Sequence, residues 1–194
     1  TMIRVTFIKI FFWYAIDQMG RDLGDVHIAG THNQDWEDLA SFTLNNTSYL
    51  VVGDIGDNFG VREESILYFI KEPKLVGRRF SDNLMVSLVA KIRFRFEGGA
   101  TDCLALAVNA NDRKIYLIGK SQVPPTVYEL PLFLGMTQST TIYTARKSAT
   151  LAGLPKSNYK AIIGSFGQSY FDNQPTALDM SENGLAASET IKLS

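Results

Sequence analysis

The sequence contains a single cysteine, Cys103, among its 194 residues. One cysteine cannot form a disulfide within the chain and excludes a metal site built from several cysteines. Only two histidines are present, His27 and His32, with no cysteine or third ligand near them, so hydrogen-bonded histidines are favoured over a zinc site. Cysteine usage leaves the cellular compartment undecided.

An excess of charge of either sign is also missing. Nineteen Lys and Arg residues face 20 Asp and Glu residues, which gives a formal net charge of -1 and a pI near 6.1. Nucleic-acid binding relies on clustered Lys and Arg that neutralise phosphates, so no nucleic-acid partner is predicted. The hydrophobic content of 45% and the length predict one globular domain over residues 1–194.

Long apolar runs are absent as well. No stretch approaches the about 20 apolar residues that a membrane helix needs, so no membrane partner is predicted. The opening segment "IRVTFIKIFFWYAID" is short and aromatic for a signal peptide, and no small-residue cleavage site follows it. We expect this segment to form one strand, followed by a second strand in "DLGDVHIAG".

Recognised catalytic motifs are missing from the chain. The sequence has no GxSxG motif, so a serine hydrolase has no nucleophile elbow, and it has no glycine-rich phosphate loop. Cys103 lies at the start of an apolar run and is expected to be a buried small hydrophobe. No catalytic residue is therefore predicted.

The sequence does contain an internal repeat. The segments "QDWEDLASFTLNNTSYLVVG" and "TDCLALAVNANDRKIYLIG" align without a gap at a constant offset of 67 residues (102 minus 35), and a weaker third copy is "TALDMSENGLAAS". The matched pairs are Asp35 with Asp102, Leu39 with Leu106, Ala40 with Ala107, Tyr49 with Tyr116 and Leu50 with Leu117. Two apolar runs around a polar turn in each copy predict a β-hairpin.

Two further strands are predicted after each of the first two hairpins, in "SILYFIKE" and "LMVSLVAKIRFRFE" and in "TVYELPLF" and "TTIYTA". Four consecutive strands without helical periodicity are typical of a propeller blade. The predicted blades span 38–96 and 103–145, with half blades at 3–29 and 176–190. About three blades are too few for a closed ring, since propellers typically have four to eight.

The motifs resemble, in order, those of a family of bacterial six-bladed β-propeller proteins, many of them secreted and without an assigned activity. The resemblance is carried by "DWEDLA", "YLVVGDIGDN" followed by Arg62, "KEP", "LALAV", "GKSQ" with "VYELPL", and "TALDMSENG", and it spans Phe12 to Ser188. Where the family usually has an acidic residue before "ALAV", this chain has Leu104. Family members are longer, so the chain resembles half of such a propeller.

The predicted fold is therefore all-β, a half β-propeller of about three four-stranded blades. Two copies joined head to tail would close a six-bladed ring as a homodimer with two-fold symmetry, in which the same surface serves both partners. The alternative is that the chain is a fragment of a longer propeller.

Acidic residues cluster where the first predicted blade begins. In a propeller, the loops that lead into the innermost strands border one mouth of the central channel. Asp35, Trp36 and Glu37 precede one such strand and Asp102 precedes the next, so these four residues are predicted to bind a small ligand. For Trp36, packing between blades is the competing interpretation.

A second acidic group follows the second strand, in "DIGDN". Asp54, Asp57 and Asn58 offer the oxygen ligands that calcium prefers, which makes calcium the one candidate cofactor. Asp and Asn beside glycine are also favoured at turns, where they bond local backbone, so these residues could instead tie one blade to the next. The segment does not fit the spacing of an EF-hand.

Two functions remain open at this stage. The first is a non-enzymatic ligand-binding or scaffold module that uses the channel mouth. The alternative is a calcium-dependent hydrolase of the lactonase or phytase kind, with an acidic site in the channel.

Overall fold

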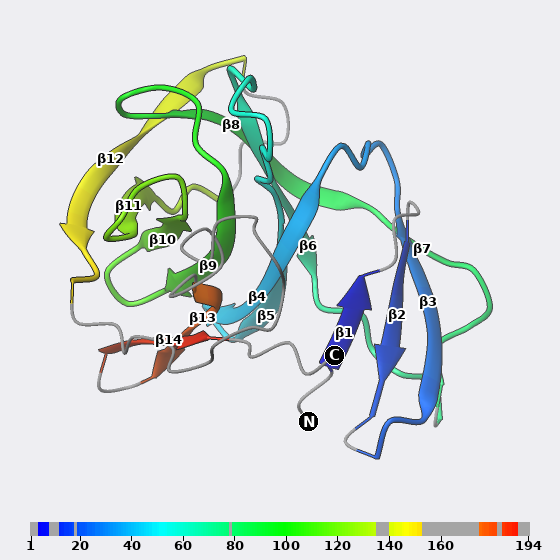
Figure 1. Ribbon diagram of the computed structural model, residues 1–194. Coiled ribbons are helices and arrows are strands. Elements are labelled where there is room, and N and C mark those ends of the chain that lie inside the picture. Colours follow the sequence, from blue (N-terminus) through cyan, green and yellow to red (C-terminus); the bar gives the residue numbers. More distant parts are fainter. Residues whose placement is uncertain are drawn as a thin grey trace, which may run out of the picture.

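The computed structural model describes residues 4–7, 12–17, 19–77, 79–134, 140–152, 175–181 and 184–189 (Figure 1). Every regular element in these ranges is a β-strand, which confirms the predicted all-β class. Within the same ranges, no helix is long and apolar enough to cross a membrane. The strands form three sheets.

The largest sheet has eight strands and nearly closes into a barrel (Figure 1). Its order is β4 (Trp36–Leu44), β5 (Thr47–Asp54), β6 (Ser65–Lys71), β8 (Leu88–Phe96), β12 (Ile142–Thr150), β11 (Thr126–Pro131), β10 (Lys114–Gly119) and β9 (Cys103–Asn109). The first unit, β4-β5-β6-β8, and the second unit, β9-β10-β11-β12, are each antiparallel. The parallel pair β8·β12 joins the units on one side, and β4 lies beside β9 on the other.

Two smaller sheets flank this barrel. The N-terminal sheet has the order β1 (Arg4–Phe7), β2 (Phe12–Ile16), β3 (Asp22–Ile28) and β7 (Leu84–Val86), and the C-terminal hairpin consists of β13 (Pro175–Ser181) and β14 (Gly184–Glu189). The expectation of a single strand over "IRVTFIKIFFWYAID" was wrong, because β1 and β2 pair antiparallel within it. The segment contains no Gly, Pro, Asn or Asp between these strands, so it carries no turn signal.

The outermost strand of each unit begins on the preceding sheet. β7 pairs parallel with β3, and the chain then continues as β8, which pairs antiparallel with β6. β12 does the same within one strand: Ile142–Ala145 pair parallel with β8, and Arg146–Thr150 pair antiparallel with β11. Backbone hydrogen bonds therefore join the first unit to the N-terminal sheet and the second unit to the first. Side-chain patterns in the sequence do not reveal this repeated arrangement.

The hairpins of the two units differ at their turns. The first turn uses two residues, 45–46, both with positive φ, whereas four residues separate β9 from β10. Consequently Tyr49 pairs with Phe42, but Tyr116 pairs with Ala107. Both strands of the second hairpin begin at the predicted offset of 67 residues (103 minus 36 and 114 minus 47), but the registers of the two hairpins differ by two residues, because the second hairpin reverses earlier.

Three apolar clusters hold the layers together. The first fills the space between the two units and includes Phe69, Phe94, Phe96 and Tyr128, with Phe96 and Tyr128 in edge contact at 4.9 Å between ring centroids. The second joins the N-terminal sheet to the first unit, and the third packs β13 against the second unit. The two units and the C-terminal hairpin thus follow one another in chain order, with β4 beside β9 and β9 beside β13.

A glycine lies near the end of the second strand of each unit, Gly53 as the penultimate residue of β5 and Gly119 as the last residue of β10, each at a point of close approach. A β-carbon at Gly53 would lie 2.5 Å from Leu106 Cδ2, and one at Gly119 would lie 2.5 Å from Thr101 Cγ2 and 3.1 Å from the Tyr128 ring. Both distances are shorter than van der Waals contact, so these positions require glycine for space.

We predict that Gly53→Ala lowers the free energy of unfolding by about 1 to 3 kcal/mol through overpacking. Leu106→Ala alone should lower it by about 2 to 5 kcal/mol. The double variant should lose less than the sum, because the truncated leucine no longer meets the new methyl group. Urea unfolding of the three variants measures this coupling, and strictly additive losses would show that the contact is not the reason for glycine.

Candidate functional site

Most of the predicted site residues gather at one end of the barrel-like sheet. Three connections meet there: the residues before β4, the β5–β6 loop and the β8–β9 loop. The amides of Ile55 and Gly56 donate to the Asp35 carbonyl at 3.2 and 3.1 Å, and the Cys103 amide donates to the Ile55 carbonyl at 3.2 Å. These bonds fix the three connections against each other. We call Asp35, Glu37, Asp54, Asp57 and Asp102 together the acidic end.

Asp54 is buried in the centre of the acidic end, 1% exposed. Its carboxylate accepts the Asp35 amide at 2.9 Å, the Gln34 amide at 3.3 Å and Arg62 Nη1 at 2.8 Å. The same Nη1 donates to the Gly56 carbonyl at 2.9 Å. These three hydrogen bonds to the Asp54 carboxylate offset the free-energy cost of burying its charge, which would otherwise be strongly destabilising.

Asp57 and Asp102 connect the loop of the first unit to the second unit. The Asp57 carboxylate accepts the amides of Val61 and Arg62 at 2.9 and 3.0 Å, which closes the loop on itself. The Asp57 amide donates to Asp102 Oδ1 at 2.9 Å, and Lys120 Nζ lies 2.8 Å from Asp102 Oδ2. These contacts fit the interpretation in which aspartates tie neighbouring units through backbone amides.

The tentative metal residues do not converge in the described part of the chain. Asp54 and Asp57 accept N–H donors, while Asn58 is exposed and only approaches Asp35 Oδ2 at 3.4 Å. Among the described residues, no three His, Cys, Asp or Glu side chains are placed to hold a metal ion. Calcium binding stays a prediction without geometric support from these ranges.

Asp35 and Glu37 face each other over Gly56. A β-carbon at Gly56 would overlap the Asp35 carboxylate and lie 2.6 Å from Glu37 Oε1, so glycine is required there for space. Burial raises the pKa of Glu37 to about 7, and the negative charge of Asp35 and a hydrogen bond with it act in the same direction, opposed by Lys120. Glu37 can therefore gain or lose a proton near neutral pH.

Asp38 is a functional group that the sequence interpretation missed. Its carboxylate accepts the Leu39 amide at 2.8 Å and the Leu106 amide at 2.7 Å, so it links β4 to β9 where no strand ladder joins them. Burial raises its pKa to about 7, and the charge of Asp179 in β13 adds to the shift. The sequence offered one sign of this role: Asp38 lies in a strand with apolar neighbours, and a carboxylate there needs a hydrogen-bond partner.

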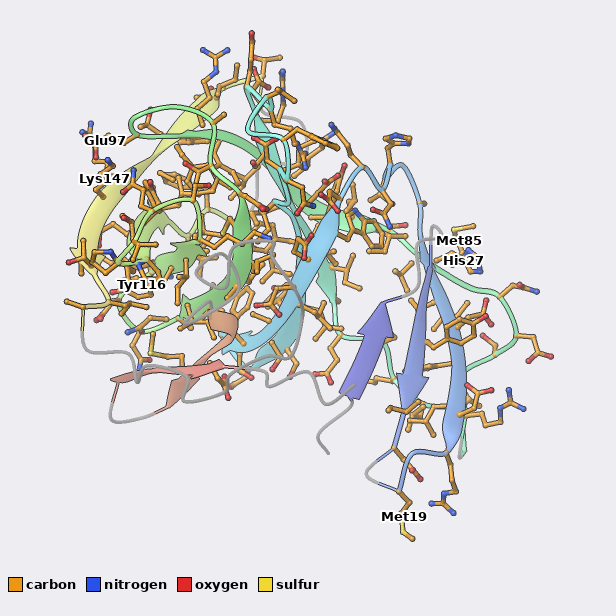
Figure 2. The ribbon with its side chains drawn as sticks, viewed as in Figure 1. Met19, His27, Met85, Glu97, Tyr116 and Lys147 are labelled. Atoms are coloured by element: carbon orange, nitrogen blue, oxygen red, sulfur yellow. The ribbon has the colours of Figure 1, made fainter. Side chains whose placement is uncertain are left out.

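Other predicted residues lie away from the acidic end. Trp36 is 7% exposed and packs in the second apolar cluster, 6.1 Å from the Tyr68 ring, because consecutive strand residues face opposite sides. Cys103 is fully buried as expected, and burial raises its thiol pKa. Figure 2 shows His27 beside Met85 on the N-terminal sheet, where His27 Nε2 lies 2.7 Å from Asp25 Oδ2.

Comparison of the sequence with protein-family models gives no match, and comparison with curated proteins gives none either. The resemblance to six-bladed propellers therefore remains a prediction from the motifs.

The raised pKa of Asp38 predicts a pH-dependent stability. Because its pKa increases from 3.8 to about 7 on folding, the folded protein keeps a proton that the unfolded chain releases. The free energy of unfolding should therefore fall between about pH 4 and 7, by at most about 1.4 kcal/mol per pH unit for one group. Asp38→Asn removes this contribution, so urea unfolding of the variant should show a flatter profile.

Glu37 contributes in the same window, since its pKa rises from 4.5 to about 7. We therefore expect Asp38→Asn with Glu37→Gln to be flatter than either single variant. A profile of Asp38→Asn as steep as that of the unchanged protein would show that this carboxyl group ionises normally when folded.

Proposed function

We propose that the chain is a propeller-type scaffold that binds a small cationic organic ligand at the acidic end, without catalysis. The observation that carries this proposal is the convergence of the Asp35 and Glu37 carboxyl groups over Gly56. The loops that present them are fixed by buried hydrogen bonds, so the carboxyl groups are oriented before a ligand arrives.

The order of the sheets supports the propeller interpretation. β4, β9 and β13 are each the first strand of a hairpin, and they lie side by side in chain order. One apolar cluster lies between the two units and another lies between the second unit and β13, as between blades that pack face to face. In this interpretation the three strands border the channel, and the acidic end is one of its mouths.

The charge balance of the mouth favours a cation. Among the described residues, the one cation that acts on Glu37 is Lys120, which is already paired with Asp102. An organic ammonium group brings N–H donors that match the two facing carboxyl groups. Calcium instead takes about six to eight oxygen ligands, which the described residues do not assemble. The ligand class that fits best is therefore an organic amine.

The proposal assigns no catalytic residue. Cys103 is fully buried with a raised thiol pKa, so it is a poor nucleophile. Asp54 and Asp57 are engaged as acceptors of backbone and arginine N–H groups, which gives them a positioning role.

We further propose that a second copy of the chain completes the ring. In the described part, β14 pairs only with β13, which leaves a strand edge open to another strand. In a two-fold dimer the N-terminal sheet of the partner would meet this edge. The joint would then contain five strands, β13 and β14 with β1 to β3 of the partner, one more than expected, because the N-terminal segment forms two strands.

The ligand proposal predicts opposite effects of charge changes in the mouth. Binding of small alkyl diamines, measured by calorimetry, should weaken about tenfold or more in Asp35→Asn and Glu37→Gln, because each loses a charge-assisted hydrogen bond. Lys120→Gln should instead strengthen binding, because it removes a like charge and frees Asp102. Equal effects of all three variants, or no binding of any diamine, would contradict the proposal.

The assembly proposal predicts a solution mass of twice the 21.6 kDa of one chain. Light scattering after size exclusion should give this value over a range of protein concentrations. A monodisperse species with the mass of one chain at all concentrations would refute the dimer and leave the ligand proposal to its own test.

A further inference from the structure

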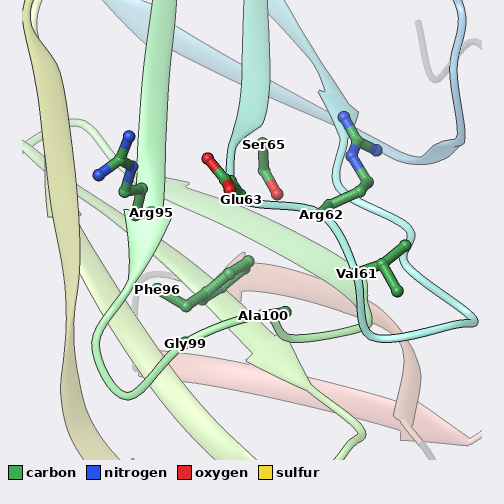
Figure 3. Close-up of a pocket in the computed structure, with 8 residues that line it drawn as sticks. All are labelled: Val61, Arg62, Glu63, Ser65, Arg95, Phe96, Gly99 and Ala100. Carbon is green, nitrogen blue, oxygen red and sulfur yellow. The ribbon is translucent and has the colours of Figure 1, made fainter.

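A concave site lies between the loop that precedes β6 and the loop that follows β8 (Figure 3). Its volume is about 380 Å³, which is within the range of small-molecule sites. The lining residues are Val61, Arg62, Glu63, Ser65, Arg95, Phe96, Gly99 and Ala100. We call this site the loop pocket.

A buried hydroxyl group points into the loop pocket. Ser65 is only 3% exposed, and Figure 3 shows its oxygen directed toward Phe96 and Ala100. Within the described part of the chain this hydroxyl group makes no hydrogen bond, and its oxygen is not sealed from solvent. The hydroxyl group is therefore available to bond a ligand that enters the pocket.

The rim of the loop pocket carries one available charge of each sign. Arg95 is 54% exposed and uses one contact, 3.1 Å from Nη2 to Glu64 Oε1, although its guanidinium group has five N–H donors. Glu63 is exposed and lies on the same side of the pocket as Arg95 in Figure 3. Arg62 also lines the pocket, but its guanidinium group is bound to Asp54 and points away.

The remaining wall of the loop pocket is apolar. Phe96, at the end of β8, and Ala100, on the loop that follows it, lie close together, and Val61 lies across the site on the other loop (Figure 3). A β-carbon at Gly99 would meet no atom within 4 Å, so the backbone there faces open space. An apolar group of a ligand could therefore cover Phe96 and Val61, the latter being 73% exposed.

We propose that the loop pocket binds a small zwitterion of the amino-acid class with an apolar side chain. The ligand carboxylate accepts hydrogen bonds from Ser65 and Arg95, the ammonium group pairs with Glu63, and the side chain covers Phe96. A purely anionic ligand would face Glu63 and a purely cationic ligand would face Arg95, so the charges of the rim favour a ligand that carries both. This site is separate from the mouth, where the carboxylates favour a ligand with positive charge only.

The test compares phenylalanine with its two halves, phenylpropionate and phenethylamine, by calorimetry on the full chain with Asp35→Asn and Glu37→Gln, so that an amine bound at the mouth does not contribute to the signal. Phenylalanine should bind at least about tenfold more tightly than either half, because each half leaves one charge of the rim unpaired. Ser65→Ala, Arg95→Gln and Glu63→Gln should each weaken phenylalanine binding by about tenfold or more.

The chain offers a matched control for the arginine. Arg93 also pairs with Glu64, at 2.5 Å, and is similarly exposed at 41%, but it does not line the pocket. Arg93→Gln should therefore leave phenylalanine binding unchanged. The proposal is overturned if phenylalanine does not bind at millimolar concentration, if either half binds as well as the whole, or if Arg93→Gln weakens binding as much as Arg95→Gln.

Discussion

Carboxylates that accept backbone N–H bonds from a neighbouring segment, half-buried at Asp38 and buried at Asp102, are the interaction on which this structure depends. Asp38 receives the Leu106 amide across a gap that no strand ladder closes, and Asp102 receives the Asp57 amide from the other unit. Apolar packing brings the two units together but is not directional, whereas these bonds fix their relative position.

The same constraint explains why carboxylates concentrate at one end of a chain with almost no net charge. Asp54 and Asp57 shape the β5–β6 loop, and that loop in turn positions Gly56 beneath Asp35 and Glu37. The most buried carboxylates of this cluster therefore hold the loops, and the less buried pair is the one to which the proposed function assigns ligand binding. The loop pocket depends on the same loop, since the segment that Asp57 closes leads directly to Ser65.

Much of the fold was predictable from local sequence patterns. Alternating apolar runs and polar turns gave the all-β class and the hairpins, because these features act over neighbouring residues. The parallel pairs β3·β7 and β8·β12 were not predictable, since they join segments distant in sequence. The repeat places the residues of the acidic end at equivalent positions before β4 and β9. The burial of Trp36 depends on packing against the N-terminal sheet, and the hydrogen bond from Leu106 to Asp38 depends on packing between the two units. Ser65 carries no motif at all and is distinguished only by its position in the loop pocket.

Amide hydrogen exchange by NMR tests the role of the carboxylates most directly. The amides of Leu106 and Asp57 donate to side chains and not to a neighbouring strand, so their protection reports on the carboxylate bonds alone. The account predicts that both exchange only through global unfolding, as slowly as amides in the centre of β5 or β10. Exchange of these two amides as fast as that of exposed Phe59 would contradict it, because the two units would then be held together without them.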